Sequence, residues 1–253
     1  MLLLSFKYPN TTTAQEFIIG VEDVSYYPLY NFSANNTTKP SFTRELLATF
    51  FEQHNYRYRF VALPLNRFDK WYLEDNIDFK FPDNIKWREQ TLNKLDITFS
   101  LPVIKLMSGS YMLASKQHYR REDIKTLGTI IGFTPTLWFD KLEGGQLAII
   151  EESSPVSIIK HLTHENIDAT NIDASVIRHN LSLLSKDIKI QVNKNIPHEI
   201  FAFHLSSVKH PQIIEEFNHF LSSNKALVNK LKIKYHIEKP LNSFDIIKHK
   251  SQP

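Results

Sequence analysis

Residues 77–87, IDFKFPDNIKW, begin like a buried strand and end on a polar and aromatic set. Apolar and polar side chains alternate over residues 77–81, which is the pattern of a strand with one buried face. Pro82 is expected to end the strand, because proline lacks the N–H group that a strand ladder needs. A carboxylate, an amide and an indole follow within five residues: Asp83, Asn84 and Trp87. The strand is therefore predicted to deliver these groups to a ligand cleft.

Two strands and two helices precede this stretch. Residues 17–24, FIIGVEDV, and residues 56–63, YRYRFVAL, have the composition of strands. Residues 40–55 and a shorter segment at 65–74 are predicted helices. A chain that alternates strand and helix is typical of a parallel sheet with helices on its faces. The first part of the chain is therefore predicted to be an α/β unit.

The helix predicted at 40–55 has one apolar face and a plausible start. Ser41 lies just before the periodic part, where serine is a preferred N-cap. Five large apolar side chains recur at helical spacing: Phe42, Leu46, Leu47, Phe50 and Phe51. This face is expected to pack on the sheet.

A second, smaller α/β unit follows an extended segment. The strand and helix alternation restarts there, with strands at 127–133, 146–152 and 167–172 and helices at 134–142, 154–166 and 173–184. Two more strands, at 187–194 and 200–207, return toward the first unit, and two helical stretches lie within 210–237. The predicted architecture has two lobes: 17–104 plus 205–237 as the first, 115–195 as the second, and hinge crossings at 105–114 and 196–204.

Composition excludes several classes of function. The net charge of +3 is too small to indicate a nucleic-acid partner. With no cysteine, the chain has no disulfide, thiolate metal site or cysteine nucleophile. Glycine-rich nucleotide-binding motifs are absent, so no cofactor is expected. His161 and His164 have a spacing that can bind metal, but no third ligand is evident, and no metal site is predicted.

The order of several segments resembles the amino-acid-binding (family 3) periplasmic solute-binding proteins of bacterial ABC transporters. The resemblance covers about residues 17–237. It is carried by the segments FIIGVEDVSYYPLYNF (17–32), NIDFKFPDN (76–84), FSLPVI (99–104), LGTIIGFTP (127–135), ENIDATNIDASVIRHNL (165–181) and KHPQIIEEFNHFL (209–221).

This resemblance implies a type II, Venus-flytrap fold of two α/β lobes that close on a small polar solute. It implies no catalysis, delivery of the solute to a membrane transporter or a sensor partner, a periplasmic location, and action as a monomer. Residues 1–16 hold a short apolar run that is either the remnant of a signal peptide or a disordered lead-in. Residues 238–253 are expected to be a loose tail.

Two residues of the second lobe are predicted to bind the ligand. In the resembling element Asp173 stands where a carboxylate pairs with the amine of the ligand; it could equally cap the helix that follows it. Thr134 precedes Pro135 at a predicted helix start, where free N–H groups could hold a carboxylate. An ordinary N-cap is the alternative. Asp168 is expected to be structural.

Other candidates come from the first lobe. The family's usual T-x-x-R motif, whose arginine clamps a carboxylate, is missing, so an ordinary α-amino acid ligand is in doubt. Arg67 is the better-placed substitute and Arg88 a weaker one; a surface salt bridge is the alternative for Arg67. Aromatic groups can stack on a ligand. The complete predicted set is Tyr26, Tyr27, Arg67, Phe81, Asp83, Asn84, Trp87, Thr134 and Asp173.

Two other functions remain open. Some relatives with this fold are dehydratases, and Asp83 or Asp173 would then act as a general acid or base. A ligand-sensing module for a signalling partner is the third possibility. A cleft acid with a raised pKa would favour the enzyme.

Overall fold

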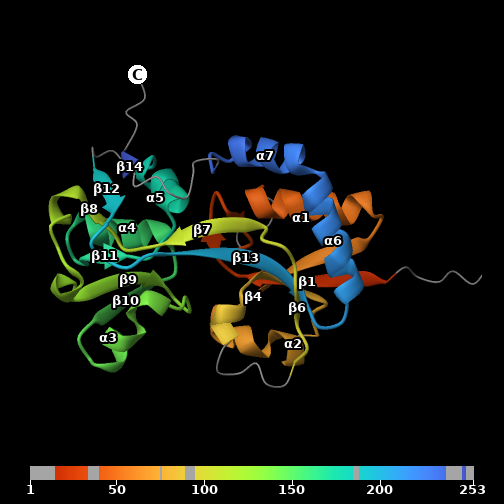
Figure 1. The fold of residues 1–253 in the computed structure, drawn as a ribbon, viewed down its shortest axis with the longest axis horizontal. Helices are drawn as coiled ribbons and strands as arrows, with labels where there is room; N and C mark the ends of the chain where they lie inside the picture. The colour runs from red at the N-terminus through yellow and green to blue at the C-terminus, as the bar shows by residue number, and fades with distance from the viewer. Residues whose placement is uncertain are drawn as a thin grey trace, which may run out of the picture.

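The computed structural model describes residues 15–33, 40–74, 76–88, 95–184, 188–237 and 247–248. The predicted lead-in and the predicted tail lie almost wholly outside the described residues. The described strands form two six-stranded sheets and one two-stranded sheet, and each large sheet is the centre of one lobe (Figure 1). The fold is therefore the α/β, two-lobe architecture that the sequence predicts.

The first lobe has a mixed sheet in the order β4-β1-β5-β13-β6, with β7 also paired to β13. Strand β1 is parallel to both β4 and β5, and β13 is antiparallel to β5, β6 and β7. The strands of this lobe are β1 (Glu16–Glu22), β4 (Arg57–Leu63), β5 (Phe79–Asp83), β6 (Thr98–Phe99), β7 (Ile104–Ser108) and β13 (Glu199–Ser207), and β2 (Ser25–Tyr26) pairs with β3 (Tyr30–Asn31).

Helices cover both faces of this sheet. Helices α1, α6 and α7 lie together on one side, and α2 lies on the other (Figure 1). Their bounds are α1 (Phe42–Gln53), α2 (Trp71–Glu74), α6 (Pro211–Ser223) and α7 (Lys225–Lys234), with 3-10 turns η2 (Leu65–Lys70) and η3 (Ile85–Arg88).

The apolar face predicted for α1 is confirmed. All five of its large apolar side chains are fully buried. Phe51 packs edge-on against Phe79 of β5, with ring centroids 5.4 Å apart. Ser41 does stand at the N-cap, but its side chain makes no capping bond. The N–H groups of Phe42 and Thr43 instead donate to loop carbonyls of Pro28 and Leu29.

Strand β5 differs from its prediction. Pro82 does not end it, because the strand runs on to Asp83, which pairs with His204 of β13. The register of β13 shifts between His204 and Ser206, and such an irregularity is a position that tolerates proline in a sheet. Ile77 lies before the strand and packs with Leu63 and Trp71 under α2.

The second lobe has the sheet order β10-β9-β11-β8-β12-β14. Its elements are β8 (Tyr111–Leu113), β9 (Thr126–Ile130), β10 (Ala148–Glu152), β11 (Ala169–Thr170), β12 (Lys189–Val192), β14 (Ile247–Lys248), α3 (Phe139–Glu143), α4 (Pro155–Thr163), α5 (Ala174–Leu181) and the 3-10 turns η5 (Ala114–Lys116), η6 (Arg121–Asp123) and η7 (Thr136–Trp138). Strands β9, β10 and β11 are parallel, as the alternation of strand and helix predicts.

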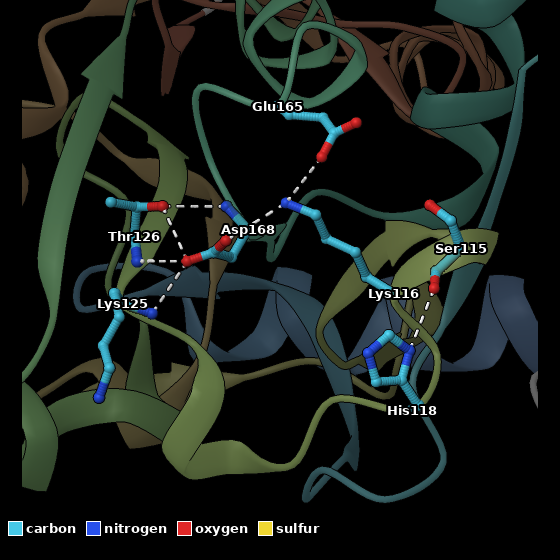
Figure 2. A network of polar contacts seen from close by, with 7 residues as sticks. All are labelled: Ser115, Lys116, His118, Lys125, Thr126, Glu165 and Asp168. Atoms are coloured by element: carbon cyan, nitrogen blue, oxygen red, sulfur yellow. Dashed lines mark hydrogen bonds and ion pairs between the residues drawn. The ribbon is translucent and has the colours of Figure 1, made fainter.

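Asp168 is a structural carboxylate of this lobe (Figure 2). Its Oδ2 accepts from the N–H groups of Lys125 and Thr126, at 3.0 and 3.1 Å, and from the Thr126 hydroxyl. Its Oδ1 lies 3.4 Å from Nζ of Lys116, which also pairs with Glu165. These bonds tie the start of β9 to the chain before β11 and hold the pKa of Asp168 below its ordinary value, against the effect of its burial.

Two strands connect the lobes. β7 and β13 run antiparallel across the middle of the molecule, with Ser108 opposite Glu199 and Ile104 opposite Phe203. Only Gly109 and Ser110 separate β7 from β8. A Cβ atom on Gly109 would lie 2.7 Å from Cγ2 of Val192, so this link packs too closely against the end of β12 for a larger residue.

Among the described residues, no helix is both long and apolar enough to span a membrane.

Candidate ligand-binding site

A cavity of about 310 Å³ lies where the two lobes face each other. Its size is at the lower end of the range for small-molecule sites. Both lobes and both crossing strands, β7 and β13, contribute to its wall. The lining residues are Glu22, Tyr26, Tyr30, Leu65, Arg67, Lys70, Asn84, Lys86, Trp87, Ser108, Gly132, Phe133, Thr134, Thr136, Asn171, Glu199, Phe201 and Phe203.

The topology explains why these residues meet. Glu22 is the last residue of β1, and Asn84 follows β5. In the other lobe Gly132 follows β9, and Asn171 follows β11. β1 is parallel to β5, and β9 is parallel to β11. Ligands of parallel strands in α/β folds bind beyond the carboxyl ends of the strands.

Five of the nine predicted ligand-binding residues line this cavity: Tyr26, Arg67, Asn84, Trp87 and Thr134. Asn84 is rigidly held, because its side chain donates to the carbonyl of Ala202 and accepts from the N–H of Lys86. Arg67 also forms the predicted surface salt bridge, with Glu74 at 2.9 Å. Both interpretations of Arg67 are therefore compatible with its position.

The other four predicted residues lie outside the cavity wall. Tyr27 packs against the ring of His179 at 4.3 Å. Phe81 and Asp83 are fully buried, and Asp83 accepts a hydrogen bond from the Ser206 hydroxyl. Asp173 caps α5, since its carboxylate accepts from the N–H of Ser175 at 2.7 Å. A ligand contact by any of these four remains a prediction.

The helix start predicted at Pro135 is wrong. Pro135 has φ −81° and ψ 68°, which is outside the helical region, so the turn η7 begins only at Thr136. The N–H of Thr136 donates to the carbonyl of Thr134 at 3.0 Å, and Thr134 lines the cavity from the loop before the turn.

Glu22 is a cavity residue that the sequence reasoning missed. Its side chain is only 3% exposed and accepts a hydrogen bond from the Tyr30 hydroxyl. Burial raises the pKa of Glu22 to about 8. The hydrogen bond from Tyr30 and the charge of Lys80 oppose this rise, and Asp83 adds to it. The available signal was an acidic residue at the end of the otherwise apolar strand 17–24.

Several contacts join the lobes around the cavity. The Tyr26 hydroxyl accepts from the N–H of Asp173 at 2.8 Å, and the Tyr26 ring packs against Phe133 with centroids 5.2 Å apart. Glu199 pairs with Lys86 of the first lobe at 2.6 Å and accepts from the Thr136 hydroxyl of the second at 3.2 Å. The lobes are therefore held together in this conformation.

The second-lobe wall has one acceptor that the chain does not satisfy. Oδ1 of Asn171 is buried and has no hydrogen-bond partner among the residues that the structure describes. An unpaired buried acceptor is costly, so a donor group on a ligand would relieve it.

Metal-binding groups do not gather in the described part of the chain: it has no set of three or more His, Asp or Glu side chains that could hold an ion. His161 pairs with Glu152 at 2.9 Å, so its position is explained by an interaction within the lobe.

Two α/β lobes, two crossing strands and a cavity between the strand ends define a two-lobe protein of the type II periplasmic-binding-protein fold. Solved structures of amino-acid-binding proteins have this fold. A mutant of ArgBP from T. maritima superposes with a TM-score of 0.67 at 15% identity, covering 88% of this chain and 96% of that one. The GluR0 ligand-binding core from Nostoc punctiforme, in complex with L-glutamate, gives 0.66 at 16% identity, covering 87% and 99%.

The ancestral amino-acid-binding protein AncCDT-1, a precursor of cyclohexadienyl dehydratase, gives a TM-score of 0.66 at 15% identity, covering 87% of this chain and 95% of that one. No family model matches the chain, and no curated protein matches it in sequence. At these identities the likeness establishes the fold alone.

Proposed function

We propose that the protein binds a small polar solute in the inter-lobe cavity without transforming it. The observation that supports this most directly is the cavity itself, whose wall combines fixed polar groups with aromatic side chains from both lobes. A mostly apolar pocket with a few placed polar groups is typical of small-molecule sites. The neighbours with the same fold include proteins solved with arginine and with glutamate bound.

Binding is proposed to close the lobes about a hinge. The shortest link between the two sheets is Gly109–Ser110, and residues 193–198 form the second link. A hinge at these two links would lie inside the first predicted crossing, 105–114, and would overlap the second, 196–204, only in part. The lobe boundaries predicted from the sequence are retained as part of this proposal. Hinge closure around a ligand is a common domain motion of such folds.

A thermal-shift screen of small polar solutes tests the binding function. A ligand at about 100 times its dissociation constant adds roughly 2.7 kcal/mol to the free energy of unfolding. Calorimetry on each hit should give one site per chain and no product. If no solute shifts the transition, the binding function is wrong.

Delivery to a membrane transporter, a periplasmic location and action as a monomer are further parts of the proposal, motivated by the fold of the neighbours. Affinity capture of the ligand-loaded protein would distinguish a transporter subunit from a sensor partner. Recovery of the protein only from the cytoplasmic fraction would contradict this role.

Dehydratase-like catalysis is the second candidate, and Glu22 is the observation that favours it. A carboxyl with a pKa of about 8 in a cavity is protonated at neutral pH and can act as a general acid. Product formation from a bound hydroxy compound, lost in Glu22→Gln, would establish catalysis. Stoichiometric recovery of the unchanged ligand would exclude it.

A further inference from the structure

The cavity wall has more cationic side chains than carboxyl groups. Among the described lining residues, three are cationic and two carry carboxyl groups: Arg67, Lys70, Lys86, Glu22 and Glu199. Glu199 is already engaged by Lys86 and by the Thr136 hydroxyl. Glu74, which is not part of the wall, pairs with both Arg67 and Lys70, at 2.9 and 3.4 Å. Asp83 and Asp173 face Ser206 and Ser175 instead. The three cations of the wall are thus balanced in part by two carboxylates, Glu199 and Glu74, and an excess of one positive charge remains before Glu22 is counted.

Glu22 does not offset this excess. Its surroundings are Tyr26 and Tyr30 from the β2–β3 hairpin and Lys80 and Asp83 from β5. Lys80 and Asp83 act on the Glu22 carboxyl with opposite signs, and burial has the largest effect. The group therefore stays protonated at neutral pH. Since Tyr30 donates to Oε2, the carboxyl proton is available to an acceptor from a ligand.

A protonated Glu22 should bind a ligand's ammonium group less tightly than a ligand's neutral oxygen. An ammonium group would need Glu22 ionised, at a cost of about tenfold in affinity for each pH unit below the pKa of Glu22. A hydroxyl or carbonyl oxygen accepts from the neutral carboxyl without that cost. A hydroxyl could also donate to the unpaired Oδ1 of Asn171.

Aromatic side chains supply the remaining wall. They come from both lobes and from β13: Tyr26, Tyr30, Trp87, Phe133, Phe201 and Phe203. Their faces suit an apolar or planar ligand body. The cavity thus combines cations, a neutral carboxyl donor and aromatic surface.

We propose that the cavity selects small carboxylic acids that carry a hydroxyl or oxo group in place of an ammonium group, with the carboxylate toward Arg67 and Lys70 and the neutral oxygen toward Glu22. This inference rests on the proposed function and narrows its ligand class. It departs from ordinary α-amino acids, which carry both charges.

Matched oxo, hydroxy and amino acids that share one carbon skeleton, with one amine that lacks the carboxylate added to the first set, test the proposal. Phenylpyruvate, 3-phenyllactate, phenylalanine and phenethylamine form one set; 2-oxoglutarate, 2-hydroxyglutarate and glutamate form another. Calorimetry on the full chain should show an oxo or hydroxy acid binding at least tenfold more tightly than its amino acid. If an amino acid or amine binds more tightly, this inference is wrong and the solute-binding function stands. If no compound of the sets binds, this inference fails, and the wider solute screen still decides the binding function.

The pH dependence of affinity provides a second, independent readout. Between about pH 6.5 and 9, affinity for the acid should fall as Glu22 ionises, by up to tenfold per pH unit above its pKa. Affinity for an ammonium ligand would rise over the same range. The fall should vanish in Glu22→Gln, which mimics the neutral carboxyl, and persist in Glu215→Gln on the exposed side of α6. A rising or flat profile in the wild type overturns the proposal.

Removal of the cations tests the predicted carboxylate position. Arg67→Met combined with Lys70→Met should weaken binding of the acid at least tenfold. Arg59→Met is the matched control, because Arg59 pairs with Glu16 near the opposite end of the strands. Equal affinity in the two variants would contradict the assigned orientation.

Discussion

The hydroxyl of Tyr26 in the first lobe accepts a hydrogen bond of 2.8 Å from the backbone N–H of Asp173 in the second. Both groups are buried at the junction of the lobes, and burial raises the pKa of Tyr26 well above its ordinary value, so the phenol stays neutral. The bond can form only when the lobes are close together. Tyr26 therefore lines the cavity and also makes a contact between the lobes.

Tyr26→Phe should weaken closure while it preserves packing. The ring contact with Phe133 remains, but the N–H of Asp173 loses its acceptor, at a cost of about 1 kcal/mol. We expect about fivefold weaker ligand binding and a larger radius of gyration without ligand in small-angle scattering. Tyr58→Phe is the control, since Tyr58 donates to Glu52 within the first lobe. Equal effects of both variants would show that closure does not depend on Tyr26.

Glu22 should make stability depend on pH. Its pKa is about 8 in the folded protein against an ordinary value of 4.5, so the folded state binds the proton more tightly. The stabilisation is fully present below about pH 4.5 and is lost as pH rises toward 8, with a limiting slope of about 1.4 kcal/mol per unit. In urea unfolding, Glu22→Gln should lack this slope. Parallel curves for the two proteins would mean that Glu22 is ionised when folded.

The Asp168 network should matter more for stability than the exposed ion pair of Lys116 with Glu165 beside it. Asp168→Ala removes the acceptor of two N–H groups and one hydroxyl, and we expect a loss of about 2–4 kcal/mol in the free energy of unfolding. Glu165→Ala removes only the exposed partner of Lys116 and should change it by less than about 0.5 kcal/mol. Equal losses in urea unfolding would refute the assigned roles.

The sequence predicted the architecture well because the architecture depends on repeated local patterns. The apolar face of α1 and the alternation of strand and helix are periodic signals, and the buried side chains follow them. Register shifts are not periodic. The continuation of β5 through Pro82 depends on β13, which is more than 100 residues away in the chain.

The candidate site was only partly predictable, because it too depends on pairing between strands that are distant in the chain. A strand end places a residue near the cleft, but which side chain faces the cavity depends on the partner strand. Asp83 follows a strand as expected and yet turns toward Ser206. Glu22 was overlooked because nothing in its local sequence reveals that Tyr30 and burial would keep it protonated.

Two substitutions of Asp173 distinguish its role as the cap of α5 from a role in ligand binding. Asp173→Ala removes the cap of α5 and should cost about 1 kcal/mol of stability, while Asp173→Asn keeps an acceptor for Ser175 and should cost less. If the carboxylate also pairs with a ligand, Asp173→Asn will weaken binding by a few kcal/mol. Calorimetry that shows unchanged affinity in Asp173→Asn would leave the cap as its only role.

Substitution of Trp87 should lower ligand affinity, whereas substitution of Asp83, four positions earlier, should lower the stability of the free protein. Trp87 lines the cavity and packs on Phe203 with ring centroids 5.7 Å apart. Asp83 lies behind the wall with no exposed surface. We therefore expect Trp87→Ala to reduce ligand affinity at least tenfold, about 1.4 kcal/mol, with little change in the stability of the free protein.

Asp83→Ala should instead destabilise the free protein by about 1–3 kcal/mol, because the Ser206 hydroxyl loses its buried acceptor. Its ligand affinity should stay within about threefold of the wild type at temperatures where the fold is intact. Phe139→Ala, on the exposed surface of α3 away from the cavity, controls for loss of an aromatic side chain. Calorimetry and urea unfolding on the three variants decide the matter. Weaker binding in Asp83→Ala with unchanged stability would place Asp83 in contact with the ligand, and unchanged binding in Trp87→Ala would remove the indole from the site.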